Sequence, residues 1–428
     1  MIDKLPSCED PGDPDLLPVD IASQRIRQML PVPDASRAES LSLDDALGRI
    51  LAADIHSPID VPSYTNSAMD GYAIAATDIP STQQNVATLQ VVGTAWAGRP
   101  YNGDIARGQA VRIMTGAMMP AGLDTVVIQE HVATDESNNT VTIDADVQPG
   151  RNVRLSGEDV TRGQSVFTAG TRLTAAHLGV LASIGIDKVQ AHRQITVAFF
   201  TTGDELRSLE QHAGETLGAG ELFDSNRYTL TAMLKRLGVR IIYLGIVPDD
   251  AESTRQTFTQ AASRADIIVT SGGVSAGEAD YVTQVIHEMG EVGFWKLAMR
   301  PGRPLAFGRV GEAFFFGLPG NPVAVMVTFY EFVQSAILQM MGASDCEVQL
   351  VTARSVSALK KSPGRTEYQR GVLSLDENGH SVVNTTGKQG AGRLTSMCEA
   401  NCLIVLPPGS SNVAAGDLVT VRPFYGLM

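Results

Sequence analysis

The spacing of apolar residues changes several times along the chain, and each change predicts a different kind of structure. Residues 21–30 have helical spacing and stop at Pro31, and residues 42–45 resemble a capping box opening a second helix through residue 50. From residue 56 to about 148, short strand-length runs alternate with Gly, Pro, Asn and Asp, which predicts a small β-barrel or sandwich. Residues 174–184 return to helical spacing, with Gly185 placed to end the helix.

The second half of the chain carries a different alternation. Between residues 195 and 335, strand-like runs alternate with helix-like stretches, which is typical of βαβ crossovers and a parallel sheet. From about residue 347 the pattern is again short strands and turns, so we expect a C-terminal β domain. The helical pieces on either side of residues 56–148 are expected to form one domain that another domain interrupts.

Composition narrows the classes of protein that fit this pattern. A chain of 428 residues is too long for one core, and 43% hydrophobic with 19% charged residues is an ordinary balance for globular domains. The net charge of -14 argues against binding nucleic acid or an anionic membrane. The four cysteines form neither a disulfide framework nor a zinc-ligand pattern. Residues 1–20 hold six acidic residues and four prolines, which predicts a mobile acidic tail. Neither a signal peptide nor a membrane span is expected, and the expected location is the cytoplasm.

Glycine-rich turns follow three of the predicted strands. They lie within residues 198–205, 267–277 and 315–322. Ligands of open α/β sheets bind beyond the carboxyl ends of the strands, and glycine there lets backbone amides approach a phosphate. Any one of these glycines can equally serve a tight turn for steric reasons alone. None of the three turns matches a nucleotide-binding pattern of the Walker A or dinucleotide type.

One of these turns also fits a different chemistry. The sequence Gly273-Val-Ser-Ala-Gly matches the nucleophile elbow of serine hydrolases. Such an enzyme needs a histidine base after the serine, and only His287 and His380 follow. His287 is expected on the helix that leaves the same turn, which points it poorly toward Ser275. The hydrolase therefore remains the weaker alternative.

Acidic and basic groups follow the strands of the same region. Glu205, Asp249 and Asp280 can converge on a hard cation such as magnesium, although isolated carboxylates are commonly solvated or cap helices. Residues 295–304 carry Lys296, Arg300 and Arg303 on a segment whose prolines forbid a regular helix. These cations can bind an oxyanion, or they can simply face water. Further basic candidates in the C-terminal domain are Arg365, Arg370, Lys388 and Arg393.

Eight motifs, in order along the chain, resemble those of the molybdopterin molybdenumtransferases called MoeA, a family that includes the C-terminal part of gephyrin. The motifs are Ser67-Ala-Met-Asp-Gly-Tyr-Ala, Arg112-Ile-Met-Thr-Gly-Ala, Gly157-Glu-Asp, Thr202-Gly-Asp-Glu-Leu, Asp224-Ser-Asn-Arg, Ser271-Gly-Gly-Val-Ser-Ala-Gly-Glu-Ala-Asp-Tyr, Arg300-Pro-Gly-Arg-Pro and Leu318-Pro-Gly-Asn-Pro. The resemblance runs from about residue 20 to the C-terminus. Related adenylyltransferases and competence-damage-type proteins lack the first motif and the final β domain.

The resemblance implies a multidomain α/β plus β protein. Its MogA-like, three-layer α/β domain binds molybdopterin and is accompanied by an extended helical domain, an inserted β-barrel and a C-terminal β-barrel. The implied segments are a disordered acidic tail (1–20), an elongated domain I (21–60 and 149–192), a β-barrel domain II (61–148), the α/β domain III (193–345) and a β-barrel domain IV (346–428).

The resemblance also implies an activity and its residues. The family inserts molybdate into adenylylated molybdopterin, with Mg²⁺ present, and releases AMP and molybdenum cofactor. Asp249 and Asp280 resemble the residues that hold Mg²⁺. Residues that resemble catalytic ones are Glu205, Asp159, Asp70 and Thr115. Those that resemble the pterin, nucleotide and molybdate sites are Ser271, Gly272, Gly273, Ser275, Gly277, Pro319, Gly320, Asn321, Pro322, Lys296, Arg300, Arg303, Pro304, Arg365, Ser396 and Arg154.

Partners follow from the same resemblance. The implied assembly is a homodimer, in which Asp70, Thr115, Arg154 and Asp159 reach the α/β domain of the other subunit. A separate adenylyltransferase would supply the substrate, and apo-molybdoenzymes or their chaperones would receive the product. Where the family commonly has Lys-Pro-Gly-Lys-Pro, this chain has Arg300 and Arg303, which keep the charge and add forked donors. A non-catalytic scaffold is the alternative, because gephyrin-type relatives also anchor other proteins; the acidic residues favour the enzyme.

Overall fold

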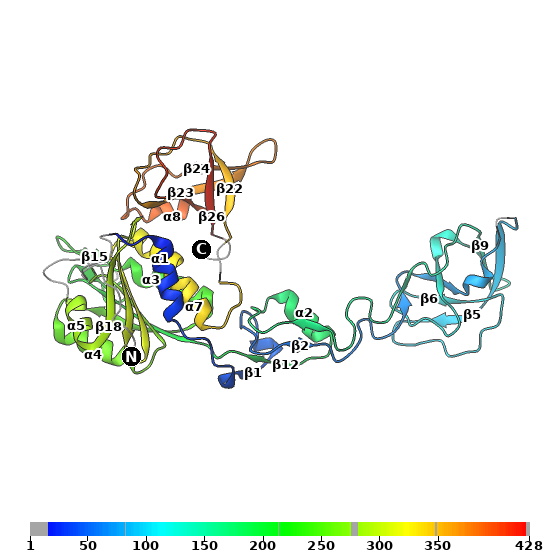
Figure 1. The fold of residues 1–428 in the computed structure, drawn as a ribbon. Coiled ribbons are helices and arrows are strands. Elements are labelled where there is room, and N and C mark those ends of the chain that lie inside the picture. Colours follow the sequence, from blue (N-terminus) through cyan, green and yellow to red (C-terminus); the bar gives the residue numbers. More distant parts are fainter. Residues whose placement is uncertain (1–15, 82, 213, 275–280, 347–348, 425–428) are drawn as a thin grey trace.

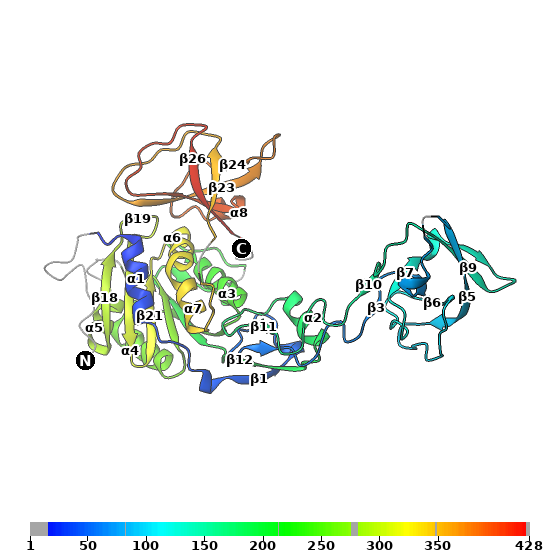
Figure 2. The same ribbon diagram turned by 45° about the vertical axis from the view of Figure 1, so that its right-hand side comes forward.

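The computed structural model describes residues 16–81, 83–212, 214–274, 281–346 and 349–424. The molecule is elongated (Figure 1). An α/β unit and a C-terminal β unit lie together at one end, a narrow arm leads away from them, and a second β unit lies at the far end of the arm. The view in Figure 2 shows the same separation.

The α/β unit is built on a six-stranded mixed sheet. Its strand order is β16-β13-β17-β21-β20-β18. The strands are β13 (Thr196–Thr202), β16 (Arg240–Val247), β17 (Ile267–Ser271), β18 (Gly290–Lys296), β20 (Pro304–Val310) and β21 (Ala313–Leu318). The first four in this order are parallel, as the sequence predicted, whereas β20 and β18 are antiparallel additions.

Helices cover both faces of this sheet and make it a three-layer structure. One face packs against α1, α3 and the helix that runs through α6, η5 and α7, and the other against α4 and α5. Their bounds are α1 (Val19–Met29), α3 (Ser225–Leu237), α4 (Ala251–Ala262), α5 (Tyr281–Met289), α6 (Pro322–Thr328), η5 (Phe329–Val333) and α7 (Gln334–Met340). Neighbouring residues of β13 therefore serve opposite layers: Phe199 joins one core and Phe200 the other.

The helix Pro322–Met340 is long and apolar enough to cross a membrane, with a mean hydropathy of 1.4. However, 78% of its most apolar 18-residue stretch is buried inside the protein. A core helix of a three-layer domain is apolar and buried in the same way, so its length and composition alone are weak evidence that it crosses a membrane.

Two predictions near the N-terminus were wrong. The acidic tail was expected to reach residue 20, but Leu17 and Val19 are buried and belong to the core of the α/β unit. The amide of Leu17 donates to the carbonyl of Lys296 at 2.8 Å, which fixes the chain there. The helix expected through residue 50 is only the short 3-10 helix η2 (Leu43–Asp45), since the chain then turns to pair Ile50 with Arg172.

The arm is assembled from two distant segments of the chain. Its strand pairs are β1 (Glu39–Ser42) with β12 (Lys188–Ala191), β2 (Ile55–His56) with β11 (Ser165–Phe167), and β3 (Asn66–Ser67) with β10 (Val153–Arg154). The predicted helix is α2 (Ala175–Ser183), which begins after Thr174 and ends before Gly185, a residue with a φ of 79°. The short 3-10 helix η1 (Ala35–Arg37) precedes β1, whereas η3 (Ala76–Asp78) and η4 (Gln129–His131) belong to the β unit at the end of the arm.

The unit at the end of the arm is a six-stranded sheet of order β7-β4-β6-β5-β9-β8. Its strands are β4 (Gly71–Ile74), β5 (Val86–Ala95), β6 (Gln109–Ile113), β7 (Thr125–Ile128), β8 (Ala133–Asp135) and β9 (Thr140–Asp144). Within the described part of the chain, β7 and β8 do not pair with each other, so the hydrogen-bonded ring that a closed barrel needs stops there.

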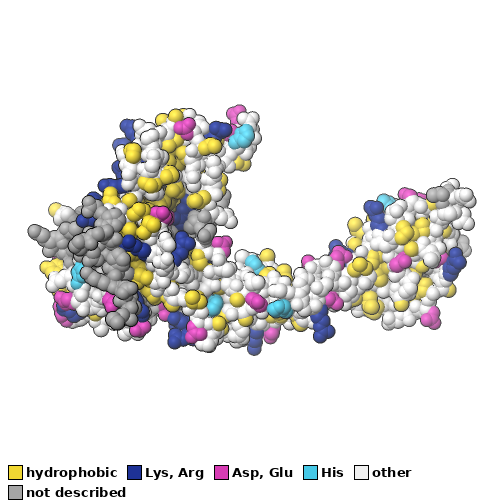
Figure 3. Space-filling model, viewed as in Figure 1, with side chains coloured by type: hydrophobic (Ala, Val, Ile, Leu, Met, Phe, Trp, Pro, Cys, Tyr) yellow, Lys and Arg dark blue, Asp and Glu magenta, His cyan; other side chains and the backbone are white. Residues whose placement is uncertain are grey.

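The C-terminal unit is a closed barrel of five strands. The order β23-β24-β22-β26-β25 closes because β25 pairs with β23, and β19 adds to the outside. The elements are β19 (Met299–Arg300), β22 (Val351–Ser355), β23 (Thr366–Leu375), β24 (Ser381–Thr385), α8 (Thr395–Glu399), β25 (Cys402–Leu406) and β26 (Leu418–Pro423). Strand β19 comes from the α/β unit and so joins the two units. Figure 3 shows apolar side chains on the barrel face above the α/β unit.

Candidate functional site

A cavity of about 930 Å³ lies at the carboxyl ends of the central parallel strands, beneath the C-terminal barrel. We call it the strand-end cavity. Ten residues that the sequence predicted for the site line it, namely Glu205, Ser271, Gly273, Arg300, Arg303, Pro304, Pro319, Gly320, Asn321 and Pro322. The turns after β13, β17 and β21, the start of α3 and the segment 300–304 thus meet at one place, as open α/β sheets predict.

The turn after β17 requires glycine for conformation and for space. Gly272 has a φ of 97° and Gly273 a φ of 66°, a region that favours glycine. A Cβ on Gly272 would lie 2.8 Å from the carbonyl oxygen of Thr202, and one on Gly273 would lie 2.4 Å from Cγ2 of Val282. The steric reason for these glycines is therefore real. Gly273 lines the strand-end cavity, so its absent side chain also leaves its backbone open to a ligand there.

Acidic residues gather beside the ends of β13 and β16. Glu205 lines the strand-end cavity. Asp249 lies next to Asp204, because the amide of each donates to the carboxylate of the other, at 3.2 and 3.4 Å. Burial raises the pKa of Asp249, and the negative charges of Asp204 and Glu205 raise it further. A cation placed here would relieve that repulsion.

Basic residues of the barrel and of segment 300–304 face a second, smaller cavity. It measures about 450 Å³ and shares Arg300, Pro301 and Gln389 with the strand-end cavity. Arg370 lines it and is buried, with Nε donating to Oγ of Ser396 at 3.1 Å. Burial and then the charge of Arg300 lower the pKa of Arg370 to about 10, so it stays cationic at neutral pH. The two adjoining cavities therefore share Arg300, with Arg303 in one of them and Arg370 in the other.

Several predicted residues lie elsewhere. Gly272 lies between two lining residues without lining the cavity, and Lys296 is exposed at the end of β18. Arg365 is half-buried in the barrel, and Ser396 is buried behind Arg370. Neither lines either cavity. Asp280 lies outside the described residues, and so do Ser275 and Gly277. The hydrolase alternative rests on Ser275 and gains no geometric support.

Four predicted residues belong to the arm and the β unit at its end, far from the cavity of their own chain (Figures 1 and 2). Oδ1 of Asp70 accepts from both the amide and the hydroxyl of Thr115, each at 2.7 Å. These two bonds lower the pKa of Asp70 and keep it anionic. Arg154 and Asp159 are exposed on the segment after the inserted sheet.

Some lining residues carried no role in the sequence analysis. Gln389 and residues 390–392 of the barrel form one wall, and Asp224 and Asn226 form part of the floor. Nothing in the sequence indicated Gln389 and residues 390–392, because they line the cavity only through the packing of the barrel against the α/β unit. Asp224 and Asn226 stand in one of the eight motifs, which was the available signal.

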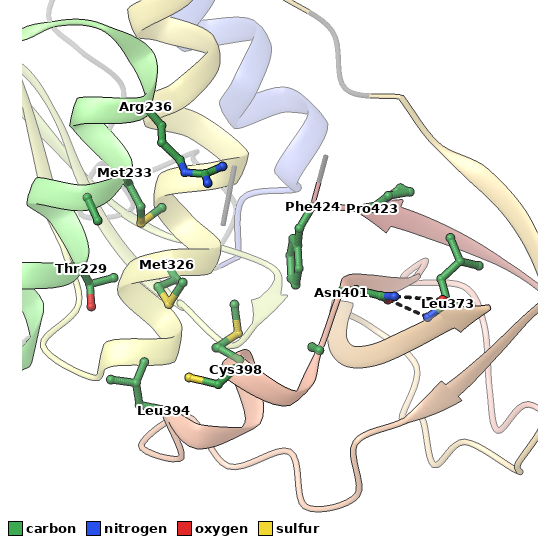
Figure 4. Close-up of a pocket in the computed structure, with 13 residues that line it drawn as sticks. Thr229, Met233, Arg236, Met326, Leu373, Leu394, Cys398, Asn401, Pro423 and Phe424 are labelled. Atoms are coloured by element: carbon green, nitrogen blue, oxygen red, sulfur yellow. Dashed lines mark hydrogen bonds between the residues drawn. The ribbon is translucent and has the colours of Figure 1, made fainter. Parts of the chain in front are cut away.

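A further cavity, of about 840 Å³, opens on another side of the contact between the α/β unit and the barrel (Figure 4). Met233, Met326 and Phe424 are among its mainly apolar walls. It contains none of the residues that the sequence predicted for the site. We therefore assign the chemistry to the strand-end cavity.

Comparisons with protein families cover nearly the whole chain. Residues 17–185 match the family model "MoeA N-terminal region (domain I and II)". Residues 198–339 match the model "Probable molybdopterin binding domain". Residues 352–424 match the model "MoeA C-terminal region (domain IV)".

Individual relatives agree with the family models. The chain is 42% identical to the molybdopterin molybdenumtransferase of Haemophilus influenzae, over 96% of this chain and 100% of that protein. It is 39% identical to the one of a Nostoc species, over 90% of this chain and 88% of that protein. Its fold resembles the crystal structure of a molybdopterin biosynthesis MoeA protein from Pyrococcus horikoshii, with a TM-score of 0.81, 27% identity and coverage of 95% and 100% of the two chains.

The geometry of the turn after β17 makes a prediction. Replacing Gly272 by Ala forces the chain away from Thr202, so the affinity for pyrophosphate, measured by calorimetric titration, should fall at least tenfold. Gly379→Ala is the matched control, because Gly379 has a φ of 80° and nothing within 4 Å of the added Cβ. The control should lose only the left-handed strain, about 1 to 2 kcal/mol of stability. If Gly272→Ala and Gly379→Ala bound pyrophosphate equally well, the turn after β17 would not be part of the phosphate site.

Proposed function

Because the chain belongs to the MoeA family of molybdopterin molybdenumtransferases, which are transferases of molybdenum cofactor biosynthesis, we propose that it inserts molybdate into adenylylated molybdopterin and releases AMP in a Mg²⁺-dependent step. The observation that carries the proposal is the strand-end cavity, where two glycine turns, an acidic cluster and an arginine cluster adjoin. The substrates carry matching groups: a phosphoanhydride and an oxyanion.

The glycine turns supply the expected contacts to the phosphates. Backbone amides near the ends of β17 and β21 can donate to phosphate oxygens. Local donors of this kind are needed because the net charge of -14 gives the chain an overall field that repels anions. Phosphoanhydride cleavage depends mainly on positioning and on stabilising negative charge, so a rigid cradle is the main contribution of this part of the protein. Glu205 at the wall is placed to act on a group bound there.

The acidic cluster fits a divalent cation that is shared with substrate phosphates. Within the described residues, no group of three His, Cys, Asp or Glu is arranged to hold a metal by itself. Magnesium usually takes one or two carboxylates and completes its octahedron with phosphate oxygens and water. Asp249 is the described candidate ligand, and the raised pKa caused by burial and by Asp204 and Glu205 is consistent with a cation there. When bound, Mg²⁺ would neutralise charge that develops on the phosphates.

The arginine cluster fits molybdate. Arg300 lines both cavities, and its largely exposed guanidinium lies 4.0 Å from the carboxylate of Glu367. Arg303 lines the strand-end cavity, and Arg370 lines the adjoining one. Forked guanidinium donors suit a tetrahedral oxyanion, which supports arginine at the two positions where the family commonly has lysine.

The arm suggests that two chains complete each site. Asp70, held by Thr115, is anionic and accessible but far from the cavity of its own chain (Figure 1). An accessible pair of this kind on an extended arm is suited to reach a second copy. We infer a homodimer in which Asp70, Thr115, Arg154 and Asp159 approach the other subunit's strand-end cavity.

The remaining partners follow from the chemistry of the substrate and the product. The strand-end cavity is proposed to receive a pterin already adenylylated, so a separate adenylyltransferase must supply it. The molybdenum-bearing pterin would pass to apo-molybdoenzymes or their chaperones. We place these steps in the cytoplasm. We propose no role for nucleic acid or membrane, because the net charge of -14 disfavours binding to either polyanionic surface.

The metal proposal is tested with Asp249→Asn, which removes a charge without changing the size of the side chain. We expect it to abolish Mg²⁺-dependent AMP release, measured chromatographically with adenylylated molybdopterin and molybdate, while the melting temperature stays near that of the parent. Asp250→Asn is the matched control. Asp250 caps α4 by accepting from the amide of Ser253 at 2.8 Å, and asparagine caps a helix equally well. Full turnover by Asp249→Asn would exclude the metal role.

The dimer proposal is tested by mixing inactive variants. Asp70→Asn damages the arm and Asp249→Asn the α/β unit, so a mixed dimer should contain one intact site of two. After subunit exchange of equal amounts, half of the dimers are mixed, and AMP release should return to about a quarter of the parent level. A mixture of Asp249→Asn and Glu205→Gln should stay inactive, because both changes fall on the same unit. An active monomer by light scattering contradicts the proposal.

The molybdate proposal is tested with Arg300→Ala. Losing a charge-assisted donor costs about 1.5 to 3 kcal/mol, so the molybdate concentration at half-maximal activity should rise about ten- to a hundredfold. The KM for the pterin substrate should barely change. Arg365→Ala tests the other arginine that the sequence assigned, and Arg354→Ala on the outer barrel is the control. A rise in the pterin KM alone would place the oxyanion on another loop.

A further inference from the structure

The motif Asp224-Ser-Asn-Arg lies across the ends of three central strands. It forms the start of α3, and two of its side chains are buried: Asp224 is 2% exposed and Asn226 is 8% exposed. Both line the floor of the strand-end cavity. Buried polar side chains at the start of a helix usually cap it, but only Asp224 does so here.

Asp224 ties the start of α3 to the end of β13. One carboxylate oxygen accepts from the amide of Arg227 at 3.1 Å and so caps the helix. The other accepts from Oγ1 of Thr201 at 2.7 Å. The helix is thereby fixed on the first of the three strands.

Asn226 ties together the other two strand ends. Its Nδ2 donates to Oγ of Ser271, the last residue of β17, and to the carbonyl of Gly320, after β21, both at 2.8 Å. The two turns also share the bond from the amide of Gly272 to the carbonyl of Leu318 at 3.1 Å. One side-chain amide therefore bridges the two turns that the proposed function assigns to the phosphates.

The same residue leaves a buried acceptor unused. Oδ1 of Asn226 has no hydrogen-bond partner among the described residues. A buried, unpaired acceptor costs about 1 to 3 kcal/mol, so asparagine is a poor choice for stability at this position. Its value must lie in the geometry that Nδ2 imposes. Among short side chains, the amide group is the one that donates two hydrogen bonds from a single uncharged atom.

We propose that Asn226 is a positioning residue that sets the separation of the turns at Ser271–Gly273 and Pro319–Asn321, so that their backbone groups converge on the phosphates of the substrate. This inference rests on the proposed function and deepens it. Asn226 takes no part in the chemical step; it acts through the turns that it bridges. Because the molybdate groups lie on the arginine side, molybdate binding is independent of it.

The test is Asn226→Ala, compared with Asn226→Leu, which keeps most of the volume. Both should raise the KM for adenylylated molybdopterin about ten- to a hundredfold, as expected when binding groups are displaced, while the molybdate dependence stays unchanged. Hydrogen exchange measured by mass spectrometry should speed up at residues 268–274 and 316–323 and nowhere else. This second measurement needs no activity.

Asn401→Ala is the matched control. Nδ2 of Asn401 donates to the carbonyl of Leu373 at 2.9 Å, and its Oδ1 accepts from the amide of Leu373 at 2.7 Å (Figure 4). The variant Asn401→Ala loses a bond from a side-chain amide to a backbone carbonyl, as Asn226→Ala does, but outside the strand-end cavity. The control should therefore change the melting temperature without changing either KM.

A double-variant cycle checks that the bridge acts as a unit. Ser271→Ala removes one of the two acceptors of Asn226, together with the bond from Oγ of Ser271 to the carbonyl of Pro319 at 3.4 Å. Both bonds join the same two turns, so the effect of Ser271→Ala on the KM should overlap with that of Asn226→Ala instead of adding to it. Additive effects, or Asn226 variants that alter only the melting temperature or only molybdate dependence, would overturn the proposal. If the parent releases no AMP, the proposed function fails, and the exchange measurement still decides whether the bridge exists.

Discussion

Complete burial of the central strands is the constraint on which the site depends. Every residue of β13, β17 and β21 is buried, because helices cover both faces of the sheet. Strands of this kind have little room for polar chemistry along their length. Polar groups that must meet a ligand therefore collect where the burial ends, beyond the carboxyl ends of the strands. The glycine turns, Glu205 and the start of α3 are all found there.

The same constraint explains what could be predicted from the sequence. Continuous apolar runs such as 267–269 and 314–316 can be recognised in the sequence, because burial on both faces of the sheet demands them. The glycines after β17 stand out as well, and the structure gives their reason: a side chain on Gly272 would collide with Thr202. The alternation of strand-like and helix-like stretches correctly predicted the parallel strands of the sheet, and the resemblance correctly implied the three-layer unit. The resemblance in eight motifs then predicted the family, which the comparisons confirm.

Features that depend on distant segments could not be read in this way. Strands β18 and β20 extend the sheet in the antiparallel direction, and neither was predicted as a strand. The proline-containing segment that was predicted not to be helical overlaps the end of β18 and the start of β20 and connects them. Arg370 lines a cavity only because the barrel packs against the α/β unit. No neighbouring residue in the sequence therefore indicates that Arg370 lines a cavity and Arg365 does not. Leu17 is buried because the chain before α1 pairs with Leu297, a contact that no local pattern encodes. Asn226 appeared within a motif, but its two bonds reach residues 45 and 94 positions away.

The two distant segments of the arm also constrain the order in which parts of the chain can fold. Strand β1 pairs Glu39 with Ala191, so the arm cannot close until the ribosome has synthesised everything between them. The inserted sheet contains all its own strands between residues 71 and 144 and can fold earlier, as an independent unit. Closing the arm around a folded insert costs less chain entropy than closing a long flexible loop, because the insert has already brought its own ends together. A folded insert therefore shortens the flexible loop that the arm must close.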